Sequence, residues 1–416
     1  MVYKQLTDYC FGPGKLERGA VKSLESEALQ ALKSVKNEEK SGQLPIISLC
    51  RESADLREIT EFATHIRNNF TRLVILGTGG SSLCGHALAG FMQNRFTKGS
   101  TEVIFLQNVD PATFSDFFKN TNLSKTAFLT ISKSGSSVET LAQMLACVEE
   151  AKTISPTTHF FSITTPGDNP LRRISKNLGI KTYDHDPNVG GRFSILSLVG
   201  LIPAIVAGMD AVKLRAGAKK FLDHHAEEAA ISASLHVALM RNNIWQNVLM
   251  TYPDNLEDLN IWYRQIWAES IGKNGTGSTP IKSMGTIDQH SQMQLYLGGR
   301  KDKFYNFITL KMPTDKFKLP SPGYPELEYL TGKTLGDLMN AEQKATIDTL
   351  VANKRPVRVI ELEKLDEETL GMLIMHLMLE TILTAHLLGV NPYDQPAVEE
   401  GKIKTREFMG RERNSI

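Results

Sequence analysis

The sequence predicts an α/β protein made of two units, each a mainly parallel sheet with helices on both faces. Short apolar runs alternate with helix-patterned segments from about residue 70, and the alternation restarts after a charged, alanine-rich stretch around 211–243. Short buried strands separated by helices are typical of parallel sheets, because each parallel connection needs a crossover. A chain of 416 residues is long enough for two or three domains.

In the first half, an expected helix at 21–40 precedes the strands. Five apolar runs are expected to form strands: 73–77, 103–106, 126–132, 160–164 and 180–184. The most apolar stretch, 193–209, contains Pro203 and two glycines and sits at the short edge of a membrane span. We therefore expect it to be a buried core helix.

In the second half, strands are expected at 247–252, 304–312 and 357–365, followed by a long buried helix at 369–389. The stretch 313–356 contains several prolines and glycines and is expected to be irregular. The predicted organisation is an N-terminal helical segment at 1–44, a first domain at 45–215 and a second domain at 216–416.

Charge and cysteine usage restrict the partners and the compartment. The formal net charge is +1, which argues against bulk affinity for nucleic acid or anionic membranes. The four cysteines show no C-x-x-C spacing, and the N-terminus has no apolar signal-peptide core. We expect a cytoplasmic protein that holds any anionic ligand locally.

The most informative motif is SKSGSSVET at 132–140, which directly follows an apolar run and opens a helix-patterned segment. Serine hydroxyls and unpaired helix N-terminal amides can donate to phosphate oxygens. The alternative is that Ser136 and Glu139 form an ordinary capping box. A single cap does not need four serines and Lys133, so we favour an anion site.

A second loop, GTGGSS at 77–82, follows the first strand of the first half and also opens a helix. It lacks the third glycine of a dinucleotide fingerprint and the Lys of a P-loop, so a tight strand–helix turn is the competing reading. Both hydroxyl-rich loops would lie at carboxyl ends of strands in one sheet. This placement favours one shared crevice.

Four further motifs carry candidate chemistry, and each also has an ordinary structural interpretation. Arg192 in GGRFS could stabilise a developing oxyanion or simply cap or salt-bridge. Gln265 and Glu269 are four apart on a predicted helix, either as a solvated stripe or with Glu269 as a general base.

His290 in DQHS has a turn-like context, and Lys402 lies on a helix that starts near Pro396. A structural histidine and an exposed helix lysine are the ordinary readings of these two residues. No metal site is expected, because the adjacent pairs around His185 and at 224–225 would diverge.

Taken together, GTGGSS, SKSGSSVET, VGGRFS, QIWAESIGK, DQHS and NPYDQPAVEEGK, in this order, resemble the glucose-6-phosphate isomerase family. The resemblance runs from 77 to 402 and implies two sugar-isomerase (SIS) domains and a homodimer. It also implies reversible isomerisation of glucose 6-phosphate and fructose 6-phosphate in glycolysis and gluconeogenesis, with no cofactor.

The resemblance assigns roles residue by residue. It implies Glu269 as the base, Arg192 as the enediolate-stabilising group, and His290 with Lys402 as the ring-opening pair, the histidine coming from the neighbouring subunit. The implied substrate-binding residues are Gly80, Ser81, Ser132, Lys133, Ser134, Ser137 and Gln265. Serines stand where many family members have threonines, and the hydroxyl donors are retained.

Two other functions stay open at the level of sequence. A dual phosphoglucose/phosphomannose isomerase would use the same residues. A non-catalytic sugar-phosphate sensor on the SIS fold would need the serine loop but not Glu269, His290 and Lys402 together.

Overall fold

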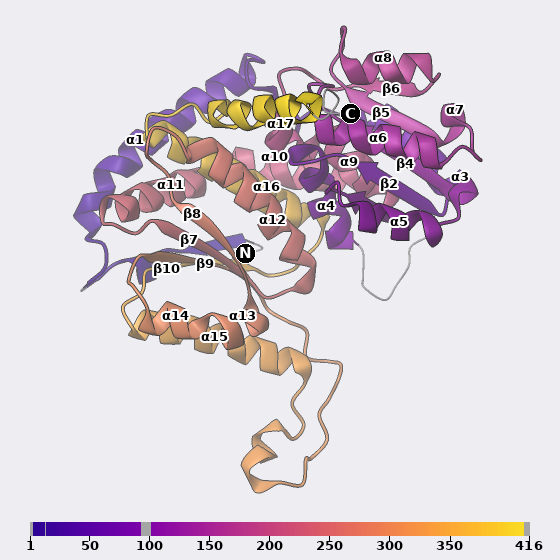
Figure 1. Cartoon of the computed structure of the whole chain (residues 1–416). Helices are drawn as coiled ribbons and strands as arrows, with labels where there is room; N and C mark the ends of the chain where they lie inside the picture. The colour runs from indigo at the N-terminus through magenta and orange to yellow at the C-terminus, as the bar shows by residue number, and fades with distance from the viewer. Residues whose placement is uncertain (1–2, 13, 93–100, 412–416) are drawn as a thin grey trace.

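The computed structural model describes residues 3–12, 14–92 and 101–411, and within them two five-stranded sheets. Figure 1 shows the two sheets in separate parts of the molecule with a thick helical layer between them. The ends of the predicted 1–44 and 216–416 segments, residues 1–2 and 412–416, lie outside the described residues. The boundaries at 44 and 215 stay a prediction.

The first sheet is entirely parallel, with the order β3-β2-β4-β5-β6. Its strands are β2 (Arg72–Leu76), β3 (Glu102–Leu106), β4 (Thr126–Ile131), β5 (Phe160–Thr164) and β6 (Lys181–Asp184). Its helices are α3 (Leu56–Asn69), α4 (Gly80–Met92), α5 (Pro111–Lys119), α6 (Val138–Glu150), α7 (Pro156–His159), α8 (Pro170–Asn177) and α9 (Leu198–Val206). All five strands predicted for this half are present.

The second sheet has the order β1-β10-β9-β7-β8, and only β1 runs antiparallel. Its strands are β1 (Tyr3–Leu6), β7 (Gln246–Thr251), β8 (Thr279–Met284), β9 (Lys303–Leu310) and β10 (Val357–Leu362). The remaining helices are α1 (Arg18–Lys40), α2 (Pro45–Ser48), α10 (Ala211–His224), α11 (Ala226–Arg241), α12 (Glu257–Ile271), α13 (Gly285–Ser291), α14 (Met293–Gly298), α15 (Leu335–Ala352), α16 (Glu367–Leu387) and α17 (Glu399–Arg411).

Alternation along the strands sorts side chains into separate cores. In β2, Leu73 and Ile75 face the large central cluster, whereas Val74 and Leu76 face a second cluster with α5 and α6. The central cluster also takes side chains from the second sheet, from α12 and from α16. One continuous apolar core therefore joins the two sheets.

Helix α16 and the 193–209 stretch are core elements, as predicted. Among the described residues, helix α16 is long and apolar enough to cross a membrane. However, 89% of its most apolar 18-residue stretch is buried inside the protein. The 193–209 stretch forms a short 3-10 turn and α9, and nearly all of it is buried.

Three expectations about local structure are wrong, and one strand was missed. The N-terminal segment is not only helical, because it also supplies β1. Strand β8 was not predicted at all. Residues 335–352 form the 18-residue helix α15 where irregular chain was expected, and His290 lies in helix α13 instead of a turn.

Candidate active site

The two hydroxyl-rich loops meet at the switch point of the first sheet. Strands β2 and β4 are hydrogen-bonded neighbours, and their crossovers leave in opposite directions, to β3 on one side and β5 on the other. Ligands in open α/β sheets bind in the crevice at such a point, outside the carboxyl ends of the strands. The strand order supports the predicted shared crevice, which stays a prediction.

Glycines in the first loop allow close approach of other chain segments. A Cβ on Gly80 would lie 2.2 Å from the carbonyl carbon of Gly191, so only glycine fits there. Gly79 has φ +58°, and a Cβ on it would lie 3.0 Å from the side-chain nitrogen of Gln265. The loop therefore touches the segment before Arg192 and the helix that carries Gln265.

In the serine-rich loop, the Ser132 and Ser136 hydroxyls donate to the hydroxyls of Ser137 and Ser134, which leaves the hydrogens of Ser134 and Ser137 for a ligand. Helix α6 begins at Val138 with Ser137 as its N-cap, and no side chain caps it, so the capping-box reading of Ser136 and Glu139 is wrong. Ser132 is buried and its hydroxyl donates to the Ser137 hydroxyl at 3.3 Å, whereas Ser134 is exposed. Hydroxyls and free helix amides converge here, as an anion site requires.

Lys133 adds positive charge to this loop. Its side chain is half-buried, and burial lowers the pKa of its ammonium, with Arg192 lowering it further and Asp186 opposing the shift. Because the charge of Arg192 lowers the pKa of Lys133, the two cations lie near each other. A bound anion would offset the unfavourable proximity of the two cations.

His185 is a neighbour of this region whose role the sequence did not reveal. The side chain is 2% exposed, its Nδ1 atom has no hydrogen-bond partner, and burial with the nearby Lys133 lowers its pKa to about 4. A neutral imidazole therefore lies beside the lysine of the serine-rich loop. The unpaired nitrogen of a buried histidine is the signal, and it can be found only in three dimensions.

Arg192 is the best-connected polar residue of the site. It lies in a 3-10 turn (Gly191–Leu196), is 3% exposed, and its Nη1 lies 3.3 Å from the Glu269 carboxylate. Burial lowers the pKa of the guanidinium, and Glu269 is the leading opposing charge. The Trp262 indole donates to the Arg192 carbonyl at 3.0 Å and anchors the turn to α12.

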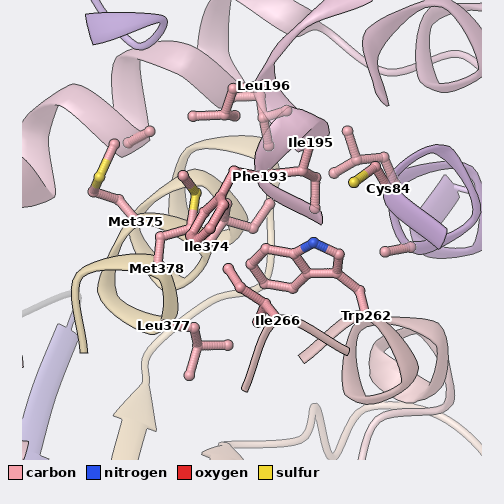
Figure 2. Packing of buried hydrophobic residues seen from close by; sticks show 14 of the residues in the cluster. Cys84, Phe193, Ile195, Leu196, Trp262, Ile266, Ile374, Met375, Leu377 and Met378 are labelled. Carbon is pink, nitrogen blue, oxygen red and sulfur yellow. The ribbon is translucent and has the colours of Figure 1, made fainter. Parts of the chain in front are cut away.

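Figure 2 shows the packing behind this turn, where Phe193, Ile195 and Trp262 lie among buried side chains of α12 and α16. In this view the indole of Trp262 lies below Phe193 and Ile195 of the turn, and Met375 and Met378 lie further to the left. Dense packing of this kind fixes the position of the Arg192 backbone.

Glu269 and Gln265 lie on one face of α12 and contact each other. The Gln265 side-chain nitrogen donates to Glu269 Oε1 at 3.0 Å, and the Gln265 Oε1 atom is buried without a partner. The Glu269 side chain is 31% exposed, so a ligand can reach it. A carboxylate, a guanidinium and an amide thus meet beside the loop at 77–82.

The segment 391–395 closes over Arg192, and sequence reasoning missed its contribution. The Gln395 side-chain oxygen accepts from Arg192 Nη1 at 3.2 Å, and the carbonyls of Pro392 and Asp394 accept from Nη2. The Ser270 hydroxyl accepts from Nε at 2.9 Å. The motif NPYDQPAVEEGK was singled out for Lys402, yet its first half makes these contacts.

His290 and Lys402 are not brought into this group within one chain. His290 is exposed on α13, and no hydrogen bond or ion pair of its side chain is found in the described part of the chain. Lys402 lies on α17, where it is exposed and paired with Glu399 at 2.6 Å. The other expected residues, from Gly80 to Glu269, cluster around the switch point.

A model of the phosphoglucose isomerase family matches residues 53–415. The chain belongs to this family. Glucose-6-phosphate isomerase of Carboxydothermus hydrogenoformans is 35% identical over 409 residues, which cover 92% of this chain and 88% of that protein. The enzyme of the same name from Rubrobacter xylanophilus is 38% identical over 383 residues, covering 87% and 88%.

Solved structures agree with the family on the fold. A hypothetical protein from Thermus thermophilus aligns with a TM-score of 0.85 at 28% identity, covering 98% of this chain and 99% of its own. A glucose-6-phosphate isomerase from Chlamydia trachomatis aligns with a TM-score of 0.80 at 18% identity, covering 99% and 88%. The expected fold class, two SIS-type α/β units, is confirmed.

Proposed function

We propose that this chain is a glucose-6-phosphate isomerase that interconverts glucose 6-phosphate and fructose 6-phosphate. One observation carries the proposal: in a phosphoglucose isomerase family member, the Glu269–Arg192 pair lies with Gln265 against the loop at 77–82, and the strand before this loop pairs with the strand that opens the serine-rich loop. The pair supplies a base and an oxyanion-stabilising cation, and the serine-rich loop supplies a handle for the phosphate. The reaction is an aldose–ketose isomerisation that belongs to glycolysis and gluconeogenesis.

The serine-rich loop would hold the 6-phosphate. Ser132, Ser134 and Ser137 offer hydroxyl donors, Lys133 offers charge, and the start of α6 offers free amides. Gly80 and Ser81 begin α4 from the neighbouring loop and would lie near the sugar. Binding at the phosphate orients the reacting carbons without taking part in their chemistry.

Glu269 would transfer the proton between C1 and C2 through a cis-enediolate. A single carboxylate can remove and return the proton on one face of the intermediate. Arg192 would offset the charge that develops on the enediolate oxygens, and Gln265 would hold Glu269 in place.

His290 and Lys402 would open the sugar ring, with His290 donated by the second subunit of a homodimer. Two observations support the partner contribution: His290 is exposed, and its neighbour Ile287 is an exposed apolar residue at 64%. Large apolar side chains beside an exposed polar candidate are typical of a subunit interface. We also propose a cytoplasmic location.

The shared site can be tested by mixing two inactive variants. Glu269→Gln and His290→Ala proteins should each be inactive, and a mixture that exchanges subunits should regain activity, because one mixed site contains both native residues. A mixture that stays inactive despite demonstrated subunit exchange would contradict the donation of His290.

The activity itself is tested by a coupled assay that starts from fructose 6-phosphate. We expect formation of glucose 6-phosphate by the wild-type protein without added metal or nicotinamide in the isomerase step. Binding of the sugar phosphate with no turnover at high protein concentration would instead identify a sensor. Comparable turnover of mannose 6-phosphate would identify the dual isomerase.

A further inference from the structure

Arg192 is enclosed by a strap, which we define as residues 391–395. The guanidinium makes five hydrogen bonds, and three of them end on this strap. Their acceptors are the Gln395 side chain and the carbonyls of Pro392 and Asp394. The orientation of the guanidinium therefore depends on where the strap lies.

The strap has few other attachments to the body of the protein. Only Pro392 of its five residues is buried. The Tyr393 ring packs against the Phe193 ring with centroids 5.9 Å apart. An exposed segment with so few contacts is held mainly by the polar groups that reach it.

Lys273 is the polar group that ties the strap to α12. It lies two residues beyond the end of this helix, and its side chain is 10% exposed. Its ammonium lies 2.8 Å from the Asp394 carboxylate and donates to the carbonyls of Asn391 and Ser270. The Lys273 ammonium thus joins Asn391 and Asp394 of the strap to Ser270, in the last turn of the helix that carries Glu269.

The same contacts favour the charged form of the Asp394 carboxyl. The hydrogen bond from Lys273 lowers the pKa of the Asp394 carboxyl, with Arg192 as a weaker contributor. A lysine at the carboxyl end of a helix also interacts favourably with the helix dipole. Lys273 therefore has an acceptor for each of its three ammonium hydrogens while it is largely enclosed.

We propose that Lys273, together with Asp394, is a positioning pair that sets the geometry of Arg192 relative to Glu269 through the strap. Neither residue needs to touch the substrate. The inference rests on the proposed role of Arg192 and extends it, because it names the groups that hold the guanidinium in place. A guanidinium that is displaced stabilises the enediolate less while the phosphate still binds.

The experiment compares Lys273→Met with Lys282→Met in the full-length protein. Lys282 is a matched control because it also ties α12, at its other end, through Glu257 at 2.5 Å, and it contacts no part of the strap. We expect Lys273→Met to lower kcat about 10- to 100-fold with KM within about twofold, as for a misplaced catalytic group. Lys273→Arg should restore most of the loss, and Lys282→Met should leave kcat within about twofold of wild type.

A second readout separates positioning from folding. A five-carbon sugar-phosphate hydroxamate, which mimics the enediolate, should bind Lys273→Met more weakly by a factor similar to the loss in kcat. A sugar-alcohol phosphate, which has no enediolate character, should bind equally well to both proteins. If Lys273→Met does not fold, Asp394→Asn on the exposed side of the pair takes its place in the same measurements.

Three results would overturn the inference. They are an unchanged kcat in folded Lys273→Met, an equal loss in Lys282→Met, or a rise in KM alone. Glu269→Gln is run in the same assay, so an inactive Glu269→Gln beside a fully active Lys273→Met rejects the positioning pair and keeps the proposed function. A wild-type protein without isomerase activity rejects both.

Discussion

Two buried arginine–glutamate pairs in this molecule differ in what surrounds the carboxylate. Arg192 and Glu269 lie 3.3 Å apart, with the arginine buried and the glutamate 31% exposed. Arg358 and Glu380 lie 2.6 Å apart, and both side chains are 0% exposed. The first pair borders the crevice of the first sheet, and the second is sealed between the second sheet and α16.

The carboxylate of the sealed pair has hydrogen-bond partners besides Arg358. His236 lies 2.7 Å from the Glu380 carboxylate and the Tyr263 hydroxyl donates to it at 3.2 Å. Burial opposes ionisation, but Arg358 and His236 outweigh it and hold the pKa of Glu380 well below its ordinary value. An ion pair with one accessible partner is thus available for the proposed chemistry, whereas a pair with both partners enclosed serves the structure.

The largest effect should come from the open pair. We expect Glu269→Gln to lower kcat by about three to four orders of magnitude, because the amide cannot accept the substrate proton. The unfolding free energy should change little, since the side chain is partly exposed. Steady-state kinetics and urea unfolding of the same preparation measure both quantities, and a kcat within tenfold of wild type would remove Glu269 as the base.

The opposite pattern is expected for the sealed pair. Arg358→Met should lower the unfolding free energy by about 3–5 kcal/mol, because it leaves the Glu380 carboxylate buried without its main partner. Turnover per folded molecule should stay near that of wild type. Denaturant unfolding measures the first value. An intact stability combined with a large loss of kcat would reverse the roles of the two pairs.

His185 should make the region of the open pair sensitive to acid. Its folded-state pKa of about 4 lies below the ordinary value of 6.5, so the unfolded chain binds a proton that the folded protein does not. Its contribution is therefore present above pH 6.5 and is lost as the pH falls towards 4, amounting to about 3 kcal/mol. His185→Asn should flatten the pH dependence of the unfolding free energy in this window; an unchanged slope would show that another group titrates there.

The smallest effect is expected in the serine-rich loop. Ser134→Ala should raise KM about fivefold with little change in kcat, since it removes one donor to the phosphate, worth about 1 kcal/mol. Ser136 is unsuitable as a control because its hydroxyl donates to the Ser134 hydroxyl at 3.0 Å. Ser53→Ala is the control, an exposed serine outside this loop to which no phosphate contact is assigned. Initial-rate kinetics with fructose 6-phosphate compare the two. A larger rise in KM for the control would contradict the assignment.

The sequence predicts the first sheet well because its strands are continuous apolar runs buried on both faces, such as 126–131. Strand β8 was not predicted because TPIKSM is an edge strand with four residues that are not buried. Helix α15 was hidden by the proline-rich chain before it, although its capping box of Thr334 and Asp337 was readable. Strand β1 pairs with residues more than 350 positions away, which no local pattern reveals.

The candidate site was also only partly predictable from the sequence. The serine-rich loop was predictable because hydroxyls, glycine and a helix start are adjacent in sequence. The strap over Arg192 was not, because its contacts join Arg192 with residues about 200 positions later. The roles of His290 and Lys402 came from the family resemblance, and they remain predictions because neither residue meets the open pair within one chain.

The most direct test of the central claim is the conversion of fructose 6-phosphate in heavy water by wild type and by Glu269→Gln. We expect rapid formation of glucose 6-phosphate by wild type, with deuterium entering at C2, because a carboxylate holds the transferred proton long enough to exchange with solvent. With the variant we expect neither product nor deuterium above a trace. Product formation by Glu269→Gln at the wild-type rate would exclude Glu269 as the base.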